Sequence, residues 1–144
     1  MKSLIILGLA LLTSSAFACT DFSGDYRTEE NTYYSIEQNG CESMYVVDET
    51  GANEMVFDGV ERLLHEYDIE VEGAILAHVQ IFLKSEMKGE KWVYYERDVV
   101  TYRGGEVEEE KKWAEVSFNE DTDLLTVLHN QDGSTETYVD VRNR

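Results

Sequence analysis

A two-residue alternation of apolar and polar side chains is the feature that most constrains how this chain folds. In residues 74–84 every odd position is apolar, whereas the even positions are mixed. Successive side chains of a β-strand point to opposite faces, so this period predicts a strand with one face in a core and the other partly solvated. Runs of the same kind recur between glycine-containing turns, and no proline interrupts them. The pattern predicts an all-β protein.

Turn signals divide the chain into the expected strands. Asn39-Gly40 lies between two alternating runs and predicts a hairpin with a type I′ turn, in which both central residues have positive φ. Asp58-Gly59 predicts a second tight hairpin. The expected strands are 22–28, 32–38, 41–48, 54–57, 60 onward, 74–84, 91–103, 111–118, 124–129 and 135–141.

Residues 60–67 fit two interpretations. The apolar residues at helical spacing are Val60, Leu63, Leu64 and Tyr67. With Asp58 as the N-cap they would form a short amphipathic helix. The Asp58-Gly59 turn and the β-rich neighbouring segments favour a strand, which is the interpretation we adopt.

Strands that follow one another through short turns predict an antiparallel up-and-down meander. A meander this long usually closes, because closure removes its unpaired edges. We therefore expect a small barrel of about eight to ten strands. One domain, residues 19–144, would form it, and its size is sufficient to bury a core.

Residues 1–18 are typical of a secretory signal peptide. Lys2 precedes the apolar run 4–12, and Ala16-Phe17-Ala18 matches the A-x-A pattern of a cleavage site. The apolar run is too short to span a bilayer, which needs about 20 residues. We expect an exported protein, periplasmic or extracellular.

The two cysteines, Cys19 and Cys41, predict a disulfide bond, because thiols of exported proteins meet an oxidising environment. A lipid anchor on Cys19 is the alternative, since cleavage after Ala18 would make Cys19 the first mature residue. Lipoprotein signals have leucine three positions before that cysteine and a small residue two positions before it. Ala16 and Phe17 stand there instead, so we adopt the disulfide.

The charge excludes some classes of partner. The whole chain has a formal charge of −18, which becomes −19 without Lys2. This excess argues against nucleic acids and anionic membrane surfaces as partners. Charged residues within 91–98, and Arg144 as the last residue, argue against insertion in an outer membrane. Such acidity could also indicate disorder, but the 11% aromatic content argues against it. We expect the folded protein to be a monomer.

The segment Phe22-Ser23-Gly24-Asp25-Tyr26 resembles the aromatic-x-Gly-x-Trp opening of lipocalins and the wider calycin group. Those families often place a late arginine across the first-strand tryptophan, and Arg142 is positioned to pack on Tyr26 in this way. Tyr26 replaces the tryptophan, and the two other conserved blocks of the family are missing. The resemblance implies an eight-stranded barrel whose cavity, open at one end, holds one small, mostly apolar ligand.

Catalytic and metal-binding patterns are weak. The sequence has no G-x-S-x-G motif, no glycine-rich phosphate loop and, once the cysteines are bridged, no Cys–His pair, so we expect neither an enzyme nor a cofactor. The spacing of the histidines does not suggest zinc, and the acidic turns do not match a calcium loop, so we expect no metal site. The histidines are His65, His78 and His129, and the turn residues are Asp48, Asn53, Asn119, Asp121 and Asp123.

Two binding roles remain. In the first, the barrel holds a small, mostly apolar ligand, and aromatic side chains with polar tips line the cavity. In the alternative, acidic stretches such as 106–110 and 115–123 bind a basic envelope or extracellular protein. We adopt the first, although the aromatic residues also suit cross-strand pairing and core packing. They are Tyr33, Tyr34, Tyr45, Tyr67, Trp92, Tyr94, Tyr95, Tyr102, Trp113 and Tyr138.

Overall fold

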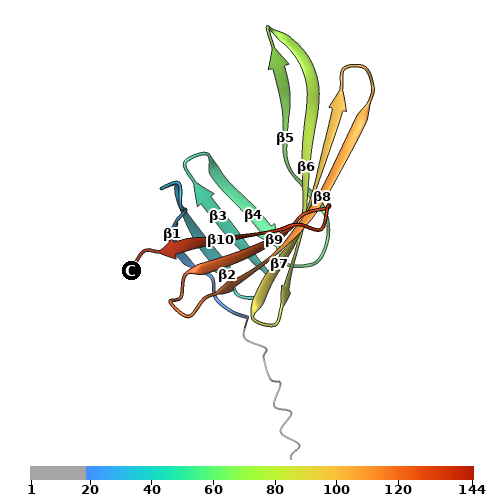
Figure 1. Ribbon diagram of the computed structural model, residues 1–144. Coiled ribbons are helices and arrows are strands. Elements are labelled where there is room, and N and C mark those ends of the chain that lie inside the picture. The colour runs from blue at the N-terminus through green and yellow to red at the C-terminus, as the bar shows by residue number, and fades with distance from the viewer. Residues whose placement is uncertain (1–18) are drawn as a thin grey trace, which may run out of the picture.

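The computed structural model describes residues 19–144, and the predicted signal peptide lies outside them. The described residues form strands and turns without a helix, which confirms the all-β prediction. The strands are β1 (Gly24–Arg27), β2 (Tyr33–Asn39), β3 (Ser43–Asp48), β4 (Gly51–Val56), β5 (Arg62–Val71), β6 (Ala74–Lys88), β7 (Lys91–Tyr102), β8 (Val107–Phe118), β9 (Leu124–His129) and β10 (Thr135–Arg142) (Figure 1).

All ten strands belong to one antiparallel sheet in the order β4-β3-β2-β1-β10-β9-β8-β7-β6-β5. Neighbours in sequence are neighbours in the sheet, except that β4 and β5 do not pair. The first and last strands are joined, with Tyr26 opposite Arg142. The product is an up-and-down meander that forms a nearly closed barrel, as the strand pattern predicts and as a calycin-like fold would require.

The tight hairpin predicted at Asp58-Gly59 is wrong, and so is the helical alternative for residues 60–67. Asp58 forms an isolated bridge with Glu86 of β6, and the amide of Gly59 donates to the carbonyl of Ser85 at 3.0 Å. The Asp58 carboxylate accepts hydrogen bonds from the Arg62 guanidinium, the shorter at 2.6 Å. The chain is therefore redirected toward β6 before β5 begins, which leaves a seam in the barrel between β4 and β5.

The turn after Asn39 also differs from the predicted type I′ geometry. The last residue pair of the hairpin is Asn39 with Ser43, so three residues form the loop, and positive φ occurs at Gly40 but not at Asn39. Cys41 lies in this loop and is bonded to Cys19, with 5.4 Å between their Cα atoms. The longer loop therefore serves to present Cys41 to the N-terminal segment.

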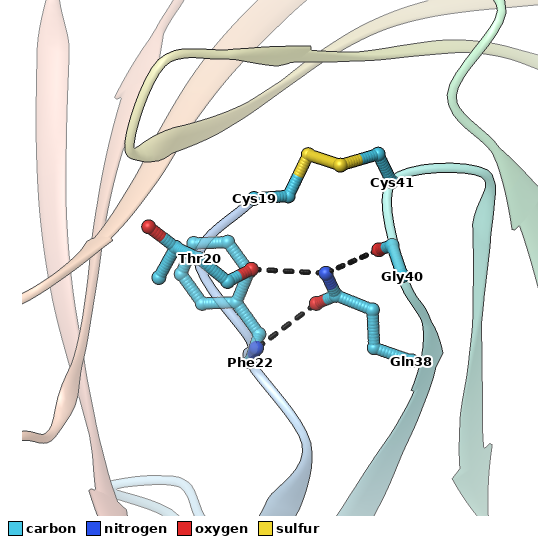
Figure 2. The surroundings of a disulfide bond; sticks show 6 residues. All are labelled: Cys19, Thr20, Phe22, Gln38, Gly40 and Cys41. Carbon is cyan, nitrogen blue, oxygen red and sulfur yellow. Dashed lines mark hydrogen bonds between the residues drawn. A yellow bond between two sulfur atoms is a disulfide. The ribbon is translucent and has the colours of Figure 1, made fainter. Parts of the chain in front are cut away.

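Gln38 fastens the same N-terminal segment beside the disulfide bond (Figure 2). Its Nε2 donates to the carbonyls of Thr20, at 2.9 Å, and Gly40, at 2.7 Å, while its Oε1 accepts from the amide of Phe22 at 2.9 Å. The disulfide and this side chain together hold residues 19–22 across the end of the barrel.

The hydrophobic core fills that same end. Phe22, Tyr26 and Met44 are completely buried there, and Phe22 packs on Phe118 with 5.1 Å between ring centroids. The Arg142 guanidinium lies 6.0 Å from the centre of the Tyr26 ring, which places it where the family resemblance expects it. One end of the barrel is thereby closed by side chains.

The β5–β6 and β7–β8 hairpins extend beyond the other end (Figure 1). The odd-numbered residues of β6 form a buried face at Ala77, Val79 and Leu83, as their alternation predicts. Near the hairpin tip, however, Ile75 is 50% exposed, because no second layer covers it there. The hairpins therefore leave apolar side chains in solvent.

Candidate functional site

A cavity of about 260 Å³ lies inside the barrel, next to the hydrophobic core. The side chains that line it come from β2–β10 because the strand period turns alternate residues inward. Trp92 belongs both to the core and to the cavity wall, and its Nε1 donates to the Ser85 hydroxyl at 2.6 Å. The lining residues are Tyr34, Ile36, Val46, Met55, Leu64, Leu83, Trp92, Tyr94, Glu96, Val116, Leu124, Thr126 and Asp140.

A hollow of about 470 Å³ adjoins the cavity beside the β1–β2 turn, and we call it the mouth. Tyr94, Thr126 and Asp140 line both spaces. The mouth is otherwise polar. Its remaining lining residues are Thr28, Glu29, Glu30, Thr32 and Tyr138.

Polar side chains also belong to the cavity wall, and Asp140 lines the mouth as well. The Tyr34 hydroxyl donates to Oδ2 of Asp140 at 2.5 Å. Glu96, which lines the cavity but not the mouth, forms an ion pair with the Lys112 ammonium at 2.8 Å, and Asp98 lies 3.5 Å from the same ammonium. The arrangement is an apolar chamber with hydroxyl and carboxylate groups at its open side, which suits a ligand that has an apolar body and a polar head.

Burial governs the ionisation of these groups. It raises the pKa of Tyr94 to about 12, and together with the Asp140 hydrogen bond it raises the pKa of Tyr34 still further above the ordinary value. Burial also raises the pKa of Glu96, an effect that Lys112 opposes. Both tyrosines are therefore neutral hydroxyl groups at physiological pH.

A second groove, of about 390 Å³, lies on the outer face of β6–β9. Tyr95, Trp113 and His129 are direct cross-strand neighbours there, and the last two rings stack with 3.8 Å between centroids. Arg97, beside them, is paired with Glu61 at 2.6 Å and Glu109 at 3.6 Å. Because these rings and charges already contact one another, the groove is a weaker candidate than the internal cavity.

The three histidines lie apart. His65 is on β5, His129 is in the aromatic stack, and His78 contacts Asp68 at 2.7 Å and Glu66 at 3.7 Å. Within residues 19–144 no group of three or more potential ligands is arranged to hold a metal ion.

The residues considered as calcium ligands, apart from Asn53, form hydrogen bonds within turns. Oδ1 of Asn119 accepts the amides of Asp121 and Asp123 at 3.0 and 2.9 Å, and Oδ1 of Asp48 accepts the amide of Thr50 at 2.7 Å. Asn53 lies within β4, opposite Val46. These contacts fit the interpretation of ordinary acidic turns.

The aromatic residues divide between the two roles considered for them. Tyr34, Trp92 and Tyr94 line the cavity and Tyr138 lines the mouth. The others lie on the outer face or on the projecting hairpins, and of these Tyr95 and Trp113 stack across neighbouring strands with 6.3 Å between ring centroids. The outward or projecting residues are Tyr33, Tyr45, Tyr67, Tyr95, Tyr102 and Trp113.

The sequence did not identify Glu96 and Asp140 as site residues. Each is a carboxylate two positions after an aromatic residue, Tyr94 or Tyr138, so that both members of the pair face inward. The two-residue spacing between an aromatic residue and a carboxylate could have identified these pairs in the sequence. Using that spacing requires knowing which face of the strand points inward, and the sequence does not show this.

No family model matches the chain, and comparison with curated proteins and with solved structures finds no match. The Cys19–Cys41 disulfide is the one predicted site that the structure confirms directly, and it indicates an oxidising, exported environment. Among residues 19–144 there is no helix with the length and hydropathy needed to cross a membrane.

Proposed function

We propose that this protein is a non-enzymatic binding protein of the periplasm or the extracellular space, and that its barrel cavity holds a small, mostly apolar ligand. The observation that carries the proposal is the internal chamber of about 260 Å³, apolar on the core side and polar at the mouth. Its volume lies slightly below the roughly 300–1,000 Å³ of sites for drug-sized ligands, so a compact ligand is expected.

The test is a thermal-shift titration with 1-octanol, a neutral probe, read together with the fluorescence of Trp92 in the cavity wall. A ligand that binds only the folded state stabilises it by about 2.7 kcal/mol at a hundredfold excess over Kd, so the melting temperature should rise. Absence of both signals with octanol and with alcohols of neighbouring chain length would refute the proposal.

A matched pair of variants locates the site. Val46 points into the cavity, whereas Val47 follows it on the opposite face of β3. Val46→Phe should fill the chamber and abolish the octanol response, and Val47→Phe should retain it. Equal responses from the two variants would place the probe outside the barrel.

Binding of a basic protein is the second candidate, and the projecting hairpins favour it. Tyr67 and Ile69 are 52% and 41% exposed on β5, and the alternate positions carry Glu66 and Asp68. Against it, the acidic stretches are partly neutralised, since Glu109 pairs with Lys111 and Glu115 with Lys91. Binding of a basic protein at physiological salt that Tyr67→Ser weakens would support this role.

A further inference from the structure

We propose that the ligand of the barrel cavity is a cationic amphiphile: a compact apolar body that carries a protonated amine, with the amine held at Asp140. The inference rests on the proposed function and adds the charge of the head group. It follows from three features of the place where the cavity meets the mouth.

The first feature is the sign of the charges. Four carboxylates line the cavity and the mouth, and within the described chain no lysine or arginine lines either space. Lys112, which contacts Glu96 of the cavity wall, is already shared by the carboxylates of Glu96 and Asp98. A ligand with a carboxylate head would therefore meet groups of its own sign, whereas an ammonium head would meet opposite charge. The four lining carboxylates are Glu29, Glu30, Glu96 and Asp140.

The second feature is that the Asp140 carboxylate has no cationic partner among residues 19–144. Its Oδ2 accepts a hydrogen bond from the neutral Tyr34 hydroxyl, and among residues 19–144 it forms no ion pair. Its negative charge thus lies at the cavity edge without a cation to balance it. Coulombic attraction is stronger at such a partly buried position than in bulk water, so a bound ammonium would gain most from this carboxylate.

The third feature is the aromatic wall. Tyr34, Trp92 and Tyr94 line the same cavity, and aromatic faces attract cations through their quadrupole. In the described chain the Tyr94 hydroxyl has no hydrogen-bond partner, so it is free to accept a hydrogen bond from an ammonium. These rings also pack against an alkyl body, so one wall serves both parts of the ligand.

Three probes with the same body test the head group: octylamine, 1-octanol and octanoate, each titrated into the full mature protein at neutral pH by calorimetry. Octylamine should bind at least tenfold more tightly than octanol, and octanoate more weakly than either. Octanol binding as tightly as octylamine, or octanoate binding best, overturns the inference but leaves the proposed function standing. Failure of all three overturns both.

Asp140→Asn tests the assigned residue, and Asp25→Asn is the matched control. The asparagine side chain in the first variant would still offer Tyr34 an amide oxygen, so the hydrogen bond can persist while the charge is lost. Asp25 lies on the neighbouring strand β1, exposed on the outer face, and the substitution there changes the net charge equally. Asp140→Asn should lower octylamine affinity at least tenfold, toward the octanol level, and Asp25→Asn should leave octylamine affinity unchanged. An equal loss in both variants would show that net charge alone is responsible and would overturn the assignment.

Discussion

The hydroxyl of Tyr34 on β2 and the carboxylate of Asp140 on β10 are joined by a hydrogen bond of 2.5 Å, although 106 residues separate them in sequence. The bond spans β1, which lies between their strands. It therefore braces the part of the barrel where the first and last strands meet, and it sets the direction of the carboxylate at the mouth.

Tyr34→Phe should lower the free energy of unfolding by about 1–3 kcal/mol, because it removes the donor from a partly buried hydrogen bond to a charged group. Urea unfolding measures the change. Tyr33→Phe is the control, since the neighbouring side chain is 58% exposed on the opposite face. Equal changes in the two variants would contradict a structural role for the bond.

Gly24→Ala should destabilise the barrel by about 1–2 kcal/mol, because the new Cβ would lie 2.8 Å from Nε of Arg142. Arg142 is held over this strand by its hydrogen bond to the Ser23 carbonyl. In an Arg142→Ala background the cost of Gly24→Ala should be smaller by roughly 1 kcal/mol. If the effects of the two substitutions are additive, the contact with Arg142 is not the reason that position 24 requires glycine.

Cys19→Ser combined with Cys41→Ser should cost about 3 kcal/mol of stability, the loop-closure value for a sequence separation of 22 residues. The double variant avoids leaving one free thiol. Chemical denaturation of this variant and of the oxidised wild type measures the difference, and the reduced wild type should match the variant. A variant as stable as the oxidised protein would mean that Gln38 alone holds the N-terminal segment.

Tyr94 should make the protein sensitive to alkaline pH. Its pKa is about 12 in the folded state and about 10 when unfolded, so the stability it contributes is fully present below pH 10 and is lost as pH rises toward 12. Between pH 8 and pH 11 the wild type should lose roughly 1 kcal/mol more than Tyr94→Phe. Urea unfolding at the two pH values tests this, and parallel losses would contradict it.

The sequence by itself determined those strands and turns whose formation depends on residues close together in the chain. Leu124–His129 is a strand with the predicted bounds. β7 ends at Tyr102 and β8 begins at Val107, on either side of the glycine pair that was expected to separate them. Alternation also identified the buried face of β6. These features follow from local physics, because the strand period and the turn preferences act within a few residues.

Only the tertiary structure decided which strands meet and which faces point inward. Asp58 pairs with Glu86 across the seam instead of closing a hairpin, and β1 pairs with β10 at the other extreme of the sequence. The candidate site depends on both outcomes, since Tyr34, Glu96 and Asp140 converge only after the sheet curls. Alternation shows that two faces exist, but the choice of the inner face is made by contacts between strands far apart in the chain.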